Sequence, residues 1–137
     1  MRMSLAASFI LMCLGMLQLN CLRHHVEIKE VPPGFEYPEY GTTIQYKQVL
    51  LFQRVAGTVV APTGDGLSEV LVEIQSADQK ERIAAMFTDT HGNFQFDNLK
   101  EGEYFIRLSK PLFSPLQANI KVAKSGKRSF KFIMMVA

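Results

Sequence analysis

The sequence predicts an all-β protein: a small antiparallel Greek-key β-sandwich of about seven strands, preceded by a signal peptide and an extended linker. Apolar and polar residues alternate in short runs, which is the pattern of strands with one face in a core. Clusters of Gly, Pro, Asp, Asn and Ser separate these runs about every 8 to 12 residues, as in sandwiches. No sustained helical period occurs after residue 21.

Residues 1–21 have the features of an export signal. Arg2 precedes an apolar run from Leu5 to Leu19, which is shorter than the roughly 20 residues that a spanning helix needs. We therefore expect export to the periplasm, the cell envelope or the medium. The alternative is a short buried or membrane-anchoring helix, because no clear small-x-small cleavage site follows the run.

Cys21 stands where a bacterial lipoprotein carries its lipidated cysteine. Residues 18–20 before it lack the small residues of a lipobox, so lipidation of Cys21 and an unmodified Cys21 both stay open. Cys13 would leave with the signal, so the mature chain would have no intramolecular disulfide. No Cys/His spacing suggests zinc, and we expect neither a metal nor a cofactor.

Residues 22–48 form the predicted linker. Pro32, Pro33 and Pro38 lack a backbone donor and have a restricted φ, so an extended course is expected. The aromatic–proline stretch 35–40 either lies along the domain surface or docks a partner, and the first is the simpler expectation. The adjacent pair His24-His25 is expected to be solvated, not to bind a metal.

Residues 49–137 form one predicted domain, since about ninety residues suffice for one small core. Gly57 interrupts a β-branched run, which indicates a bulge or a close approach of backbones. Gly92, in the turn 88–93, is free to take a positive φ, and Asp89 can cap that turn. The apolar run 49–52 opens the domain, and the seven predicted strands are 55–61, 70–74, 83–87, 94–96, 103–108, 118–122 and 129–136.

Two strands have features beyond simple alternation. The last strand, 129–136, is apolar on both faces near its end: Phe130 lies on one face, and Ile133 and Met135 lie on the other. Such a strand should be central in its sheet or covered by the linker. On the strand 70–74, alternation predicts a solvated Glu73. By the same rule Phe105 is the one clearly outward aromatic residue of a domain strand.

The central hairpin and the strand after it carry an ordered series of turn and core residues: Thr88-Asp89, Gly92, Phe94, Phe96, Leu99 and Gly102-Glu103-Tyr104. Upstream, Gly57 to Val60 and Gly66-Leu67 continue the series. The order and spacing of these residues resemble the carboxypeptidase regulatory-like family, small β-sandwiches of the transthyretin-like (prealbumin-like) class. A run at 110–114 departs from the aromatic–glycine turn that such domains often carry.

The domain offers no evident catalytic set, and we expect no enzyme. Its one histidine, His91, lies in a turn, and the carboxylates Glu73 and Asp97 have no partner spacing for acid–base work. The oxygen donors of residues 89–93 lack the regular spacing of a calcium loop, so a turn explains them better.

Two relatives in this class suggest chemistry that the residues do not support. Hydroxyisourate hydrolase uses histidines, an arginine and a tyrosine-arginine-glycine-serine tail, whereas this chain ends at residues 132–137 with Phe-Ile-Met-Met-Val-Ala. A transthyretin-like hydrolase therefore remains a remote alternative. The collagen-adhesin B-type repeat forms a lysine–asparagine isopeptide bond, for which Lys47 and Glu73 are candidates, but the last strand has no asparagine.

The resemblance thus implies a non-enzymatic, exported module for structural, adhesion or protein-interaction roles at the cell envelope. Its expected partner is a protein or polysaccharide of the envelope; nucleic acid is not expected at a net charge of +2, and a membrane only through the signal or a lipid anchor. A carbohydrate-binding module is the alternative, although the chain has no Trp. The basic residues Lys121, Lys124, Lys127, Arg128 and Lys131 are expected to form a solvated hairpin, with binding to an anionic surface as the alternative.

Overall fold

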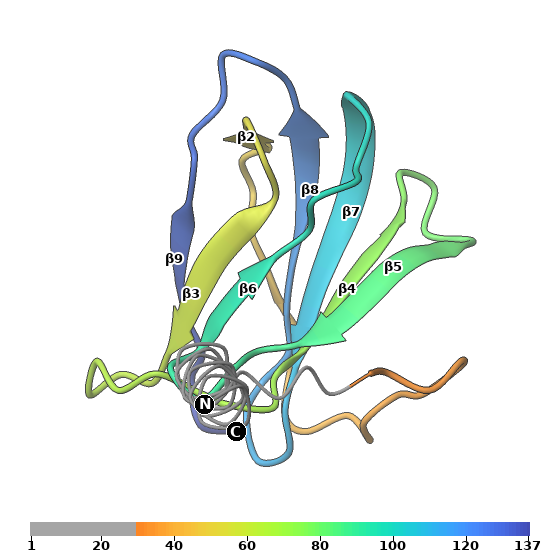
Figure 1. Ribbon diagram of the computed structural model, residues 1–137. Helices are drawn as coiled ribbons and strands as arrows, with labels where there is room; N and C mark the ends of the chain where they lie inside the picture. The colour runs from red at the N-terminus through yellow and green to blue at the C-terminus, as the bar shows by residue number, and fades with distance from the viewer. Residues whose placement is uncertain (1–29) are drawn as a thin grey trace, which may run out of the picture.

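A computed structural model describes residues 30–137 as two β-sheets packed face to face (Figure 1). The predicted signal, Cys21 and the His24-His25 pair lie outside the described residues. No helix of the described part is long and apolar enough to cross a membrane. The strands are β1 (Ile44–Gln45), β2 (Leu50–Phe52), β3 (Ala56–Val60), β4 (Leu71–Ser76), β5 (Arg82–Phe87), β6 (Asn93–Gln95), β7 (Gly102–Ser109), β8 (Leu116–Val122) and β9 (Phe130–Ile133).

The larger sheet has the order β1-β8-β7-β4-β5, and β2 also pairs with β8. Its centre is antiparallel: Val72 of β4 lies opposite Leu108 of β7 and opposite Met86 of β5. Both β1 and β2 run parallel to β8. The short first strands thus extend the sheet at its β8 end, because β8 has no other described neighbour there.

The smaller sheet has the order β6-β3-β9, with β3 and β9 parallel. The predicted all-β sandwich is therefore confirmed, and the structure adds parallel pairings to the antiparallel ladder expected from alternation. The loop at 123–129 carries the chain from β8 in the larger sheet to β9 in the smaller one (Figure 1). The two-residue β1 lies inside the predicted linker and was not predicted, and β2 forms within the apolar run 49–52 that opens the domain.

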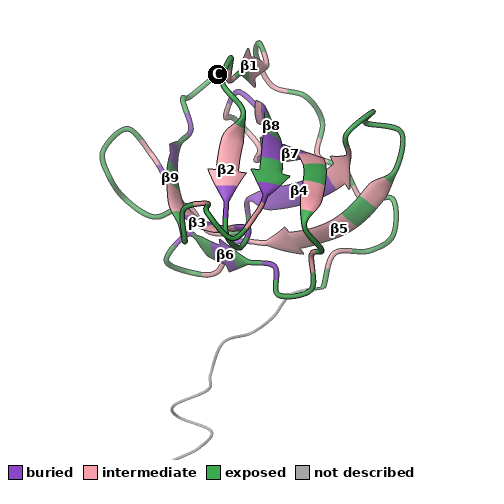
Figure 2. Ribbon diagram, turned by 90° about the horizontal axis from the view of Figure 1, so that it is seen from above, coloured by how far each residue is buried: buried purple, intermediate pink, exposed green. Residues whose placement is uncertain are grey.

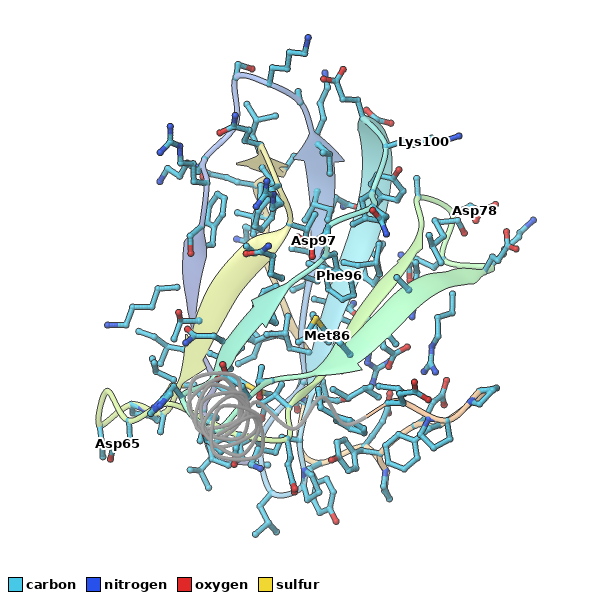
Figure 3. All side chains as sticks on the ribbon, viewed as in Figure 1. Asp65, Asp78, Met86, Phe96, Asp97 and Lys100 are labelled. Atoms are coloured by element: carbon cyan, nitrogen blue, oxygen red, sulfur yellow. The ribbon has the colours of Figure 1, made fainter. Side chains whose placement is uncertain are left out.

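The core lies between the sheets and is formed by the alternating apolar residues of both inner faces. Figure 2 shows the buried residues on the central strands, with exposed residues on the surrounding loops. Phe132 of β9 lies 6.1 Å from Phe94 of β6, between ring centroids. Phe96, after β6, belongs to this apolar cluster and Met86 of β5 packs against it; both side chains lie between β6 and the β4–β5 side of the larger sheet (Figure 3).

Gly57 allows the close approach that the sequence suggested. A Cβ atom there would lie 2.4 Å from the carbonyl oxygen of Phe130 and 3.0 Å from the ring of Phe94. Because β3 is sandwiched between β6 and β9, no larger side chain fits at this point.

The expectation for the last strand was wrong. β9 is an edge strand rather than a central one, and Ile133 and Met135 are each 48% exposed. The strand also ends earlier than predicted, at Ile133. Beyond it, the Ser114 N–H donates to Met135 and the Ala137 N–H donates to Leu112, so a loop from the other sheet pairs with the terminus.

Alternation also misplaced two residues on the outer face of the larger sheet. Glu73 is 4% exposed and Phe105 is 2% exposed, whereas both were expected to face solvent. Leu71, on the same face, is fully buried. The reason is that β4 and β7 are central strands and that both of their faces are covered. On such strands, alternation of side chains between the two faces does not distinguish buried from exposed residues.

The described part of the predicted linker, residues 30–48, packs against the sandwich. Phe35 and Tyr37 contact Phe87 of β5, with ring centroids 5.6 and 6.2 Å away. Glu39 forms an ion pair with Arg107 at 2.9 Å. We call residues 32–41 the strap, because they lie along the sheet as the simpler expectation had it.

Tyr46, which follows β1, is stacked on Phe132 at a centroid distance of 6.1 Å. Burial raises the pKa of the Tyr46 phenol above its ordinary value. Above a pH of about 10 the unfolded chain loses this proton while the folded chain keeps it, so stability falls as the pH rises toward the raised pKa.

We therefore expect the free energy of unfolding to fall more steeply between pH 9 and pH 11 (about one unit either side of a free phenol's pKa) for the natural chain than for Tyr46→Phe. Urea denaturation at a series of pH values measures the difference. Equal slopes for the two proteins would contradict the assignment, because the remaining tyrosines are common to both.

Candidate interaction surface

The turn that the sequence singled out is held by its own groups. The Asp89 carboxylate accepts hydrogen bonds from the N–H groups of His91 and Asn93, both at 2.9 Å. The Gly92 N–H donates to the Asp89 carbonyl at 3.0 Å. These bonds engage the loop oxygens, as expected for a turn. Among residues 30–137, no group of three or more His, Cys, Asp or Glu side chains is arranged to hold a metal ion.

The two carboxylates considered for acid–base chemistry belong to different sheets. Glu73 of β4 forms an ion pair with Arg82 at 3.0 Å. Asp97 follows β6 and accepts a hydrogen bond from the Gln95 side chain. Lys47, the candidate for an isopeptide bond, is exposed just after β1. The fold therefore does not bring the candidate residues together.

The basic stretch spans the turn from β8 to β9, and all five of its cationic side chains are exposed. None forms an ion pair with a residue of the described part. The backbone of this turn is fixed: the Lys127 N–H donates to Leu51, and the Gln53 N–H donates to Lys127. The Lys127 ammonium lies 5.1 Å from the Phe130 ring centroid. A rigid turn thus presents its charges to solvent.

Most sheet edges of the described sandwich are protected against pairing with another chain. The β8 edge is covered by β1 and β2. β6 has three residues, and its Asn93 and Gln95 are exposed polar side chains. β9 presents Lys131, and the loop at Leu112–Ser114 pairs beyond its end. Short length, lysine and a covering segment are the usual devices that prevent edge-to-edge association.

The β5 edge is longer, carries no lysine and is covered by no described strand. β5 ends the larger sheet and has six residues, of which the last five, Ile83 to Phe87, carry no charge. Ile83 is 46% exposed. Ile83 is the extra residue of a β-bulge, because Ile74 pairs with Ala84 whereas Gln75 pairs with Arg82, so the regular part of this edge is Ala84 to Phe87. The sequence predicted this strand but not its edge position, which depends on the strand order.

The hairpin that carries β5 is well ordered by local bonds. The Asp78 carboxylate, at the tip of the hairpin (Figure 3), accepts hydrogen bonds from the Ser76 hydroxyl at 2.6 Å and the Lys80 N–H at 3.1 Å. These bonds lower the pKa of Asp78 because they favour its charged form. The Ser76 N–H also donates to Glu81 at 2.8 Å. The turn that leads into β5 is therefore held by its own hydrogen bonds.

An aromatic cluster lies beside the same edge. Phe35 and Tyr37 of the strap form an edge-to-face pair at 5.1 Å, and both contact Phe87. Arg82 donates to the Phe35 carbonyl at 2.6 Å while it pairs with Glu73. The outer face of β5 is thus apolar toward Phe87, and its one cation is engaged.

The chain is similar to a known domain family in sequence and to solved structures in fold. The model of the carboxypeptidase regulatory-like domain matches residues 54–135. No curated protein matches. A similar solved structure is the 5-hydroxyisourate hydrolase of Klebsiella pneumoniae, with 16% identity and a TM-score of 0.45 over 61% of this chain and 89% of that one. Another is 3-chlorocatechol 1,2-dioxygenase of Rhodococcus opacus 1CP, with 15% identity and a TM-score of 0.48 over 80% of this chain and 70% of that one.

Proposed function

This chain belongs to the carboxypeptidase regulatory-like domain family, and on that premise we propose that it is a non-enzymatic, exported interaction module of the cell envelope. Its partner is a polypeptide that adds a strand to the β5 edge. The observation that carries this proposal is the uncharged β5 edge at Ala84 to Phe87, which pairs with no described strand on its open side, with the exposed Ile83 beside it. Main-chain hydrogen bonds would supply affinity, and the apolar side chains beside them would supply selectivity.

The candidate chemistry of the described domain supports a binding role over an enzymatic one. Glu73 is neutralised by Arg82, and the Asp89 carboxylate is engaged by the backbone of its own turn. His91 is exposed in that turn. These arrangements stabilise the fold, and the proposal needs no reactive group. A transthyretin-like hydrolase remains the remote alternative.

The carbohydrate-binding alternative calls for exposed aromatic side chains that stack on sugar rings. Within the described residues, every Phe and Tyr is buried or half-buried. Phe105, the expected outward aromatic, is 2% exposed. Phe35, Tyr37 and Phe87 mainly pack against one another. Polypeptide recognition therefore agrees better with this surface than glycan recognition.

A photocrosslinking residue at position 83 in the full-length gene tests the proposal in the native envelope. We expect a protease-sensitive adduct at position 83 and none at position 49, since Val49 is also exposed and apolar but lies outside β5. An adduct that only a glycosidase removes would favour the carbohydrate alternative. No adduct at position 83 would contradict the proposed function. The mass of the recovered protein also reports whether residues 1–21 are removed and whether Cys21 is lipidated.

A further inference from the structure

We infer that the basic end of the sandwich binds a linear anionic polysaccharide. The basic end consists of the turn 123–129 and the strand ends beside it, with the exposed cations Lys121, Lys124, Lys127, Arg128 and Lys131. This turn lies at the opposite end of the molecule from the strap (Figure 1). The site is thus a second binding surface, separate from the β5 edge of the proposed function.

Positive charge is concentrated in this part of the chain. Residues 121–131 contain five Lys and Arg residues and no acidic residue. Five positive charges exceed the net charge of +2, so the remaining residues together are net acidic. None of the five forms an ion pair with a described residue, although Glu103 of β7 lies opposite Lys121. A local positive potential of this kind attracts an anionic partner.

The backbone of the turn is held against the end of β2. The Lys127 N–H donates to the Leu51 carbonyl at 3.0 Å, and the Gln53 N–H donates to the Lys127 carbonyl at 2.8 Å. A Cβ atom at Gly126 would lie 2.1 Å from the backbone carbonyl carbon of Phe52, so the turn packs directly on this strand. Because the turn is already ordered, binding a ligand costs little backbone entropy.

The five cations lie around the end of the sandwich, not on one plane. Lys121 is exposed between the buried Ile120 and Val122, so it faces outward from the larger sheet. Lys131 is exposed next to the buried Phe132, so it faces outward from the smaller sheet. The other three cations lie in the turn that connects these strands. A flexible anionic polymer can follow this course over both sheets, whereas a bilayer surface would meet the cations of one side only.

Uncharged polar groups continue this course across the smaller sheet. The register places Lys131 of β9 opposite Thr58 of β3, and Thr58 opposite Asn93 of β6. The Thr58 hydroxyl donates to the Asn93 side-chain oxygen at 2.7 Å, and no described residue accepts a hydrogen bond from the Asn93 NH₂ group. With strands about 4.8 Å apart, the row extends about 10 Å from the cation at its end. A cation beside amide and hydroxyl groups suits a polymer that carries both carboxylates and sugar hydroxyls.

Single-stranded nucleic acid is the other flexible polyanion. Proteins that bind it combine cations with exposed aromatic side chains on which the bases stack. Every Phe and Tyr of residues 30–137 is buried or half-buried. The basic end therefore suits an anionic polysaccharide better than a nucleic acid.

Calorimetric titration of the purified full chain with polygalacturonate, a linear polysaccharide of carboxylated sugars, tests the inference. We expect binding at low salt that weakens as NaCl is added. Lys127→Gln with Arg128→Gln should lower the affinity about tenfold, the effect of two lost surface charge contacts. Lys47→Gln with Lys80→Gln removes the same charge from exposed lysines outside the basic end and should leave the affinity unchanged. Circular dichroism spectra verify that both double variants fold.

Asn93→Ala distinguishes a sugar ligand from polyanions in general. It should lower the affinity for polygalacturonate about threefold, the effect of one lost hydrogen bond. It should leave the affinity for polyglutamate unchanged, because that polymer has carboxylates but no hydroxyl groups. An unchanged affinity for polygalacturonate, or equal losses for the two polymers, would overturn the recognition of sugar hydroxyls.

Three further results would overturn the inference. They are no binding of polygalacturonate at low salt, equal affinities of the two double variants, and tighter binding to phosphatidylglycerol vesicles or to oligothymidylate than to polygalacturonate. The proposed function would stand in each case, because crosslinking at position 83 tests a different surface.

Discussion

Gly92→Ala is expected to lower the free energy of unfolding by about 4 kcal/mol, from backbone strain and overpacking together. Gly92 has a φ of 83°, in the left-handed region that favours glycine. A Cβ atom there would also lie 2.3 Å from the Val59 carbonyl oxygen and 2.8 Å from the Leu67 nitrogen. Both neighbours are backbone atoms, so the 88–93 turn would have to move away from β3.

Gly64→Ala is the matched control, because Gly64 has a similar φ of 92° but nothing within 4 Å of its added Cβ. It should cost only about 1 kcal/mol, the conformational part of the effect. Urea denaturation of the two variants measures the difference. Equal losses of stability would show that the contact of the turn with β3 contributes little.

Arg82→Ala is expected to lower the free energy of unfolding by about 3 kcal/mol, because it leaves a buried carboxylate without its counter-ion. The Glu73 side chain is 5% exposed and lies 3.0 Å from Arg82. The same guanidinium holds the Phe35 carbonyl of the strap at 2.6 Å. The variant should therefore also increase hydrogen exchange of the strap amides.

Arg107→Ala provides the control for this ion pair. Its partner Glu39 has a side chain that is 69% exposed, so the loss should be about 1 kcal/mol or less. The double variant Glu73→Leu with Arg82→Leu should recover much of the stability lost in Arg82→Ala, because no charge is then buried. A double variant as unstable as Arg82→Ala would contradict the ion-pair explanation.

The fold was predictable from residues that act locally. Alternating apolar residues located most strands, and the 88–93 turn was predictable because Gly92 and Asp89 have conformational and hydrogen-bonding preferences of their own. The same local information indicated that Gly57 lies where backbones approach closely.

The candidate surface was not predictable to the same extent. Ile83 to Phe87 was recognised as a strand, but an edge strand and a central strand of similar composition look alike in a sequence. The opposite error occurred for Ile133 and Met135, where two apolar faces suggested a covered strand. The fold instead places them at the exposed end of β9.

The amino-acid pattern thus established the all-β class, the family and the positions of most strands, because these depend on periodicity and on turn residues close in the chain. Strand order, the cover over Glu73 and Phe105, and the open edge at β5 arose only from contacts between distant segments. Glu73 shows the reason: its ion pair is with Arg82, nine positions later, and Arg82 also donates to the Phe35 carbonyl of the strap. Alternation within β4 carries no information about either segment.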